Sequence, residues 1–92
     1  MKIGVYPGSF DPFTIGHLDV LKSASQLFDQ VYAAVLLNKN KQYSFTVEER
    51  MEMLQKAVEQ EGFRNVRCGH FTGLLVDYVR SVNANFIVRG LR

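Results

Sequence analysis

The sequence contains no tryptophan, one cysteine and two prolines among 92 residues, and these scarcities exclude several classes of protein. A single cysteine forms no internal disulfide, and Met1–Gly4 has no long apolar stretch typical of a secretory signal. No hydrophobic run approaches the roughly 18 residues that a membrane-spanning helix needs. A Gly-Lys-Ser/Thr phosphate loop is also absent, which argues against a kinase or a switch GTPase. We therefore expect a cytoplasmic protein without a membrane role.

The charge balance is mild, which limits the kinds of ligand that the chain requires. Eleven Lys and Arg residues against nine Asp and Glu residues give a net charge of +2. This charge is too small to demand nucleic acid, but it suits ligands that carry phosphates. Hydrophobic residues make up 47% of the chain and charged residues 22%, as in globular domains. We expect one domain over residues 1–92, with a site for small molecules.

Apolar periodicity and turn residues predict an alternation of strands and helices. This alternation implies a parallel sheet with right-handed crossovers, as in a Rossmann-like α/β fold. With the strand order 3-2-1-4, the winding reverses between strands one and four, so their carboxyl ends form the expected site. The expected elements are strands at 2–6, 31–37, 65–69 and 85–89, helices at 14–28 and 46–62, and a helix from about Thr72.

Capping and turn residues set the expected boundaries of these elements. Pro7 and Gly8 are expected in the turn at 7–13, because neither residue favours a strand or a helix interior. Thr14 is a candidate N-cap, and Thr46 with Glu49 has the spacing of a capping box. The apolar stripe of the first helix is expected to face the core at Leu18, Leu21, Ala24, Leu27 and Phe28.

The turn at 7–13 and the residues that follow it contain the groups that phosphate chemistry needs. Gly8 allows a tight main-chain turn, and Ser9 offers a hydroxyl. Free amides at a helix N-terminus favour an anion by about 0.3 to 1 kcal/mol. Gly16 leaves room for a nucleotide near that helix, and His17 in its first turn can donate a hydrogen bond to a phosphate oxygen while charge develops.

These residues also carry a resemblance to a known family. Gly8-Ser9-Phe10-Asp11-Pro12 followed by Thr14-Ile15-Gly16-His17 resembles the signature of the nucleotidylyltransferase superfamily. Most members place a histidine two residues before the glycine, whereas a threonine there is similar to the bacterial phosphopantetheine adenylyltransferases. Lys41 and the stretches 45–50, 73–75 and 89–92 resemble the same family, in order and near its spacing.

The resemblance implies transfer of an adenylyl group from ATP to 4'-phosphopantetheine, giving dephospho-coenzyme A and pyrophosphate. The implied mechanism is direct in-line attack without a covalent intermediate, with His17 as the transition-state stabiliser. Mg²⁺ is expected to accompany ATP, and no metal ligand is implied in the chain. The implied contacts with the phosphorylated thiol are Ser9, Lys41, Leu75 and Arg89. The implied contacts with ATP are Ser9, Phe10, His17, Gly90, Leu91 and Arg92.

The resemblance further implies a homohexamer, with coenzyme A as a feedback ligand and no nucleic-acid or membrane partner. Family members continue with a fifth strand, further helices and a serine-rich loop that have no counterpart in these 92 residues. We therefore expect an incomplete nucleotidylyltransferase domain, and the activity of this chain alone stays open. One alternative is a catalytically silent nucleotide-binding or assembly fragment. Another is a different nucleotidylyltransferase, such as a CTP-dependent one, although Thr14, Lys41 and Arg89 argue against it.

Simpler explanations apply to several other residues. Arg89 directly follows the apolar Phe86–Val88, so we expect it to leave a buried strand end, a usual place for a functional residue. Leu75 is expected in the core or in a pocket wall. Cys68 has no cysteine or histidine at metal-ligand spacing and is interpreted as a packed thiol, whereas His70 is interpreted as an ordinary surface residue.

Overall fold

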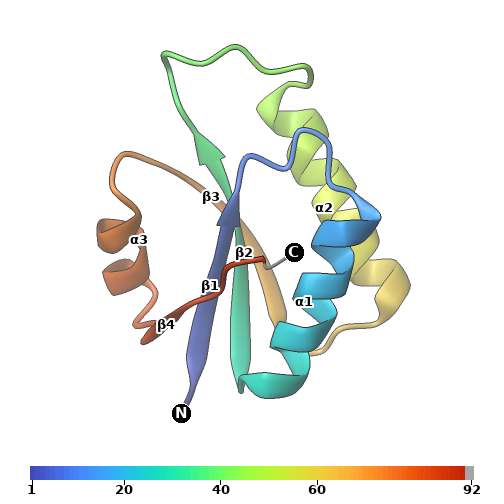
Figure 1. The fold of residues 1–92 in the computed structure, drawn as a ribbon, viewed down its shortest axis with the longest axis vertical. Helices are drawn as coiled ribbons and strands as arrows, with labels where there is room; N and C mark the ends of the chain where they lie inside the picture. Colours follow the sequence, from blue (N-terminus) through green and yellow to red (C-terminus); the bar gives the residue numbers. More distant parts are fainter. Residues whose placement is uncertain (91–92) are drawn as a thin grey trace.

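In a computed structural model that describes residues 1–90, four parallel strands form one sheet with helices on both faces (Figure 1). The strand order is β3-β2-β1-β4, which confirms the predicted Rossmann-like α/β fold and its order 3-2-1-4. The elements are β1 (Ile3–Gly8), α1 (Ile15–Leu27), β2 (Gln30–Leu37), α2 (Val47–Glu61), β3 (Val66–Thr72), α3 (Leu75–Ser81) and β4 (Phe86–Ile87).

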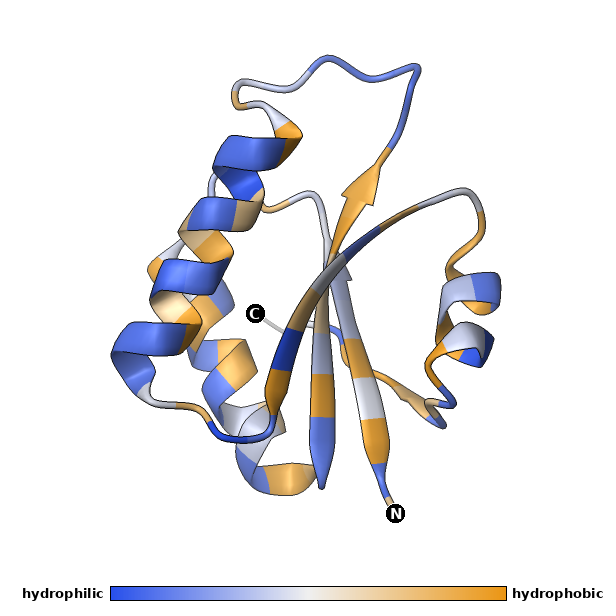
Figure 2. Ribbon diagram, turned by 180° about the vertical axis from the view of Figure 1, so that it is seen from behind, coloured by the Kyte–Doolittle hydropathy of each residue, from blue (hydrophilic) through white to orange (hydrophobic). Residues whose placement is uncertain are grey.

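Two layers of side chains, one on each face of the sheet, form the core. Helices α1 and α2 cover one face, where Leu21 and Leu54 pack with Val31 and Val35 of β2. Helix α3 covers the other face, where Ala34 belongs to a second cluster. Because β2 is covered on both sides, nearly every one of its positions is apolar, as predicted. Figure 2 shows that hydrophobic segments lie on the central strands, whereas hydrophilic segments lie on the outer side of α2.

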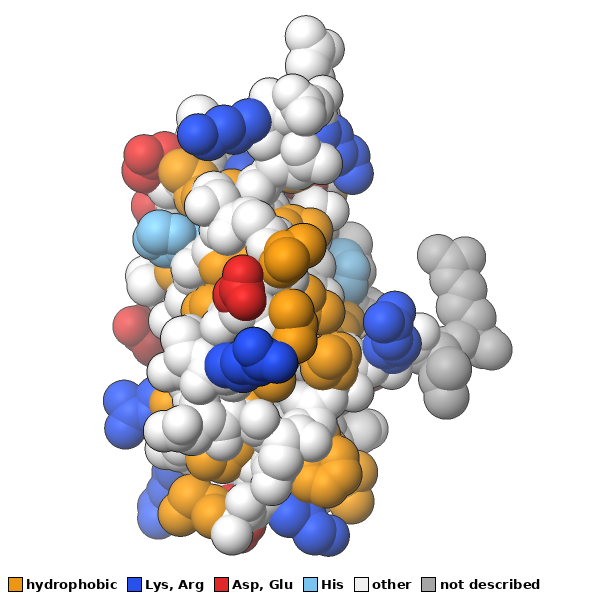
Figure 3. Space-filling view, turned by 90° about the vertical axis from the view of Figure 1, so that its left-hand side faces the viewer, with side chains coloured by type: hydrophobic (Ala, Val, Ile, Leu, Met, Phe, Trp, Pro, Cys, Tyr) orange, Lys and Arg blue, Asp and Glu red, His pale blue; other side chains and the backbone are white. Residues whose placement is uncertain are grey.

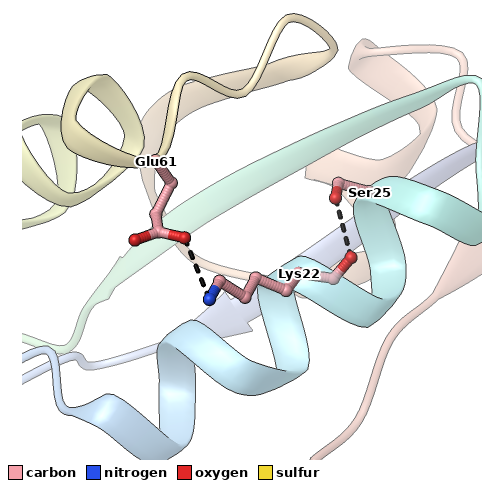
Figure 4. A network of polar contacts seen from close by, with 3 residues as sticks. All are labelled: Lys22, Ser25 and Glu61. Atoms are coloured by element: carbon pink, nitrogen blue, oxygen red, sulfur yellow. Dashed lines mark hydrogen bonds and ion pairs between the residues drawn. The ribbon is translucent and has the colours of Figure 1, made fainter.

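The predicted capping box of α2 is confirmed. Thr46 Oγ1 accepts the Glu49 N–H at 3.1 Å, and Glu49 Oε1 accepts the Thr46 N–H at 2.9 Å. The helix ends at Gly62, which adopts the left-handed conformation with φ 67°. At this end Lys22 Nζ of α1 lies 3.0 Å from Glu61 Oε1 of α2, and Ser25 Oγ donates to the Lys22 carbonyl (Figure 4). The two helices on this face are therefore joined by an ion pair as well as by the core.

The predicted start of the third helix at Thr72 is wrong. Thr72 is the last residue of β3 and pairs with Leu37, because the parallel ladder with β2 continues beyond the expected end at 69. Gly73 then turns the chain with φ 89°, a conformation that other residues rarely adopt, and α3 begins only at Leu75. The longer ladder gives β2 and β3 carboxyl ends that lie side by side.

Two expectations near the first helix also need correction. Pro7 and Gly8 are strand residues of β1 rather than turn residues, and they pair with Ala34 and Val35. Proline is tolerated here because the pairing of β1 with β4 ends before it, at Val5. Leu27 is 66% exposed, so the inward stripe of α1 does not include it.

The fourth strand is shorter and more exposed than expected. It comprises only Phe86 and Ile87, each 43% exposed, although Asn85 and Val88 extend the hydrogen bonding to β1. The expectation of a buried strand end before Arg89 is therefore wrong. The physical reason is that, within residues 1–90, β4 is the edge of the sheet and only β1 pairs with it.

Helix α3 covers its face of the sheet with one side only. Leu75, Tyr78 and Val79 pack against the second core cluster, whereas Leu74 and Val76 are 66% and 48% exposed. Figure 3, which views the side that carries α3, shows hydrophobic side chains scattered between charged ones. Among residues 1–90, no helix is long and apolar enough to cross a membrane.

The packing predicts a large difference between two leucines. Replacing the fully buried Leu54 by alanine should lower the free energy of unfolding by about 3 kcal/mol, because it leaves a cavity between α2 and the sheet. The same change at the exposed Leu27 should cost less than about 1 kcal/mol. Urea unfolding followed by circular dichroism measures both. Equal losses in the two variants would contradict the arrangement of α1 and α2.

Candidate functional site

A pocket of about 360 Å³ opens at the carboxyl end of β1. Gly8 and Phe10 line it from the first loop, Gly16 and His17 from the start of α1, and Gly90 from the segment after β4. Its other lining residues are Tyr6, Pro7, Thr14 and Val20. The structure thus brings together the first loop and the segment after β4, as the predicted strand order requires.

The side chain of Phe10 is buried within the first loop and packs against its neighbours. Its ring is 2% exposed and forms edge contacts with the rings of Tyr6, Phe13 and His17 at centroid distances of 5.0 to 5.3 Å. Its backbone is left-handed, with φ 48°. A Cβ at Gly8 would lie 2.7 Å from the Phe10 ring, so only glycine fits there. Because the side chain is buried, any role of Phe10 toward a phosphate belongs to its main chain.

The hydrogen bonds of His17 determine which of its ring nitrogens carries the proton. Nδ1 lies 2.9 Å from the Thr14 backbone N–H, which donates to it, and 3.0 Å from Thr14 Oγ1. The His17 N–H in turn donates to Thr14 Oγ1 at 3.3 Å, which completes a capping box at the start of α1. Because Nδ1 accepts, the proton of the neutral ring is on Nε2. His17 therefore offers an N–H donor beside the pocket.

Burial also shifts the pKa values of two groups in the pocket wall in the direction that favours their neutral forms. Desolvation by the surrounding rings lowers the pKa of His17 below its ordinary value, which favours the neutral imidazole. Burial likewise raises the pKa of the Tyr6 phenol, which stays protonated at neutral pH. Neutral donors are thus combined with the amides at the N-terminus of α1, where an anion is favoured.

A second pocket, of about 350 Å³, lies on the other side of the same strand end. Pro7 and Gly8 line both pockets, and Leu36, Phe71 and Leu75 give the second one an apolar wall. The expectation that Leu75 lies in the core or in a pocket wall is confirmed, since it also packs on the second core cluster. The two pockets therefore present a polar and an apolar compartment that meet at Gly8.

The structure does not bring all the predicted site residues to these pockets. Ser9 lies within the first loop, and Lys41 lies in the 38–46 segment with its Nζ 5.7 Å from the Tyr43 ring centroid. Arg89 lines a separate groove with Val20 and Val88, between α1 and β4. Leu91 and Arg92 lie outside the described residues. The ligand contacts of Ser9, Lys41 and Arg89 stay predictions.

Arg50 is an important residue that the sequence analysis missed as part of the site. It is 2% exposed, and its Nη1 donates to the carbonyls of Ser9 at 3.1 Å and Leu36 at 3.4 Å. It therefore joins the loop after β1 to the end of β2. The sequence does contain a signal for this burial. The capping box fixes the start of α2, and Arg50 lies four residues before Leu54, on the side of the helix that faces the core.

Asp11 provides a second link between the same two loops. Its carboxylate oxygens accept the N–H groups of Ser44 and Phe45 at 2.7 and 2.8 Å. Within residues 1–90, no group of three or more His, Cys, Asp or Glu side chains is placed to hold a metal ion. The acidic side chain of the first loop is thus already engaged in structure.

Cys68 and His70 behave as expected from the sequence. Cys68 is half-buried against the first core cluster, and its pKa is raised by burial and by nearby Glu59, as for a packed thiol. His70 is exposed on β3. Glu48 and Glu49 occupy the first turn of α2, where the helix dipole favours them.

Comparisons with known proteins agree with this geometry. The profile of the cytidylyltransferase-like family matches residues 5–92. Curated relatives named phosphopantetheine adenylyltransferase include those of Clostridium perfringens strain SM101, 49% identical over the whole chain, and Heliobacterium modesticaldum, 51% identical. This chain covers 55% and 54% of those two proteins, so it spans about half their length.

The fold also matches a solved structure. A protein of Vibrio parahaemolyticus assigned as a nicotinate-nucleotide adenylyltransferase superposes with a TM-score of 0.73 and 18% identity. The match covers 94% of this chain and 58% of that one. At this identity the likeness extends to the fold alone.

The environment of His17 predicts its titration. The imidazole of His17 should titrate below pH 6.5, because partial burial of the ring in the folded chain disfavours its charged form. The contribution of His17 to stability is then present above pH 6.5 and is lost as the pH falls through its lowered pKa. Two-dimensional NMR of the imidazole resonances, assigned with a His70→Asn variant, measures the midpoint. A midpoint at or above 6.5 would contradict the desolvated site.

Proposed function

The chain belongs to the cytidylyltransferase-like family, and on that premise we propose that its site serves adenylyl transfer from ATP to 4'-phosphopantetheine. The products are dephospho-coenzyme A and pyrophosphate. Relatives that are about half identical over the whole chain carry the name phosphopantetheine adenylyltransferase, which supports this acceptor over the substrate of a CTP-dependent enzyme. The proposal concerns the site that this chain carries.

One observation carries the proposal most directly. A polar pocket with the α1 N-terminus and His17 adjoins an apolar pocket with Leu75, and the two share Pro7 and Gly8. A nucleoside triphosphate would suit the polar pocket, because helix amides and neutral donors favour phosphate oxygens. A pantetheine arm fits the apolar side. The phosphates of the two substrates would then meet near Gly8, where the main chain allows close approach.

The proposed reaction needs no nucleophile from the protein. A phosphate oxygen of 4'-phosphopantetheine attacks the α-phosphorus of ATP in line, one P–O bond forms, and the bond to pyrophosphate breaks as that group leaves with the electron pair. The site would hold the reactants in line and stabilise the charge that builds on the α-phosphate oxygens. His17 Nε2–H is the proposed donor for that charge, since its Nδ1 is already engaged by Thr14.

The remaining assignments also belong to the proposal. Ser9 and Lys41 are proposed contacts of the thiol's phosphate. Arg89 could join them only if its side chain leaves the groove that it lines with Val20 and Val88. Mg²⁺ would enter with ATP as part of that substrate. A homohexamer and coenzyme A as a feedback ligand are proposed from the resemblance alone, whereas a cytoplasmic location is proposed from the single cysteine and the apolar pattern of the sequence.

Replacing His17 by alanine should lower adenylyl transfer by about 100-fold or more, as expected for loss of one transition-state donor. Binding of ATP and of 4'-phosphopantetheine should change little, because the donor acts mainly as charge develops. Pyrophosphate release measures turnover, and calorimetry measures binding. His70→Ala, at the exposed histidine of β3, is the matched control and should leave both unchanged.

Equal losses of binding and rate in His17→Ala would contradict the role of His17. A wild-type chain that binds both substrates without turnover would instead favour a silent nucleotide-binding module. These two results are distinct, because the first is a property of the variant and the second a property of the unaltered chain.

A further inference from the structure

The ring of Tyr43 lies near two cationic side chains at the carboxyl edge of the sheet. The Arg50 guanidinium carbon is 3.9 Å from the centroid of its ring, and Lys41 Nζ is 5.7 Å from the same centroid. Both distances fall within the range of a cation–π interaction. The ring thus connects a buried arginine to a lysine on the exposed 38–46 segment.

The arginine side of this contact is fixed. Arg50 is 2% exposed, and its Nη1 donates to the Ser9 and Leu36 carbonyls. These carbonyls belong to the loop after β1 and to the end of β2, so the guanidinium has little freedom to move. A planar guanidinium is suited to this role, because it can donate in its plane and stack on a ring with its face.

The tyrosine hydroxyl fixes the main chain that leads to Lys41. It accepts the Asn38 N–H at 2.9 Å and donates to the Leu36 carbonyl at 3.5 Å. The Asn38 carbonyl then accepts the Lys41 N–H at 3.1 Å. Tyr43 therefore constrains Lys41 twice, through its ring at the ammonium group and through its hydroxyl at the backbone turn.

The residues just after Tyr43 are held to the first loop as well. Asp11 accepts the N–H groups of Ser44 and Phe45, the two residues that follow Tyr43. The segment that carries Lys41 is thus tied to the first loop by Asp11 and, through Tyr43, by Arg50. Without these ties a lysine on an exposed loop would sample many rotamers, and ordering it on a ligand would cost conformational entropy.

We propose that Tyr43 is a positioning residue that acts through Lys41, holding its ammonium group ready for the phosphate of the acceptor thiol. The inference rests on the proposed function, because it takes that phosphate as the ligand of Lys41. It adds a residue whose hydroxyl and ring already contact Asn38, Leu36, Arg50 and Lys41. Its effect should therefore fall on one substrate only.

Replacing Tyr43 by leucine should weaken binding of 4'-phosphopantetheine by about fivefold while leaving ATP binding within about twofold. Tyr43→Phe keeps the ring and loses the hydroxyl, so it should recover most of the affinity. Tyr32→Leu is the matched control, because it removes the same side chain from β2, where Tyr32 packs on the second core cluster. Calorimetry measures the affinities, and thermal unfolding confirms that each variant is folded.

A double-mutant cycle separates positioning from a general structural role. In a Lys41→Ala background, Tyr43→Leu should produce no further loss of 4'-phosphopantetheine affinity, since the residue through which it acts is gone. Pantetheine without its phosphate should bind the wild type and Tyr43→Leu equally. Additive losses in the cycle, or an equal weakening of ATP binding, would overturn the proposal.

A ligand-free readout distinguishes failure of this inference from failure of the proposed function. The Tyr43 ring should shift the NMR resonances of the Lys41 Cε protons upfield, and Tyr43→Leu should return them to ordinary values. If this shift is absent, the proposal that Tyr43 positions Lys41 is wrong, whatever the binding measurements show. A wild-type chain that shows the shift but binds no 4'-phosphopantetheine overturns the proposed function, while the Tyr43–Lys41 contact itself stands.

Discussion

The parallel pairing of β1 with β2 is the constraint on which the rest of the structure depends. It runs from Ile3 with Gln30 to Gly8 with Val35, and it buries both strands between helices on the two faces. Parallel strands deliver the loops that follow them to the same edge. The first loop and the 38–46 segment therefore leave the sheet side by side. Main-chain carbonyls at this edge, those of Ser9 and Leu36, accept hydrogen bonds from within the protein.

The buried side chain of Arg50 provides these hydrogen bonds. It satisfies carbonyls of Ser9 and Leu36 and gives the Tyr43 ring a surface on which to stack. Its Nε has no hydrogen-bond partner within the described residues, which is a cost at a buried position. That an arginine occupies this place despite the cost is consistent with a site that needs its loops held in one arrangement.

Much of the fold could be predicted because the local signals agree with one another. The Thr46–Glu49 capping box indicates the start of a helix, and the short apolar run at 31–37 indicates a strand covered on both faces; both predictions were confirmed. The start of α3 was predicted three residues too early, because the continued pairing of β3 with β2 is a long-range interaction with no local signature. The exposure of β4 was missed for the same reason, since burial of a strand depends on its neighbours.

In the candidate site, too, local sequence patterns could be interpreted correctly, whereas contacts between distant segments could not. The pattern of residues from Gly8 to His17 identified the pocket, because its glycines and its histidine are required at fixed positions around one loop. Sequence could not show that Phe10 is buried inside that loop, nor that Thr14 determines the tautomer of His17. Arg50 and Tyr43 were missed because their importance lies in contacts between segments, which spacing along the chain does not reveal.

The most direct test of the account is a calorimetric titration of the chain with dephospho-coenzyme A, the proposed product, which would occupy both pockets under this proposal. Saturable binding at about one equivalent per chain is expected, since the polar and apolar compartments meet at Gly8. ATP and 4'-phosphopantetheine should each compete with it. A folded chain that binds no dephospho-coenzyme A would contradict the claim that these two pockets form one adenylyl-transfer site.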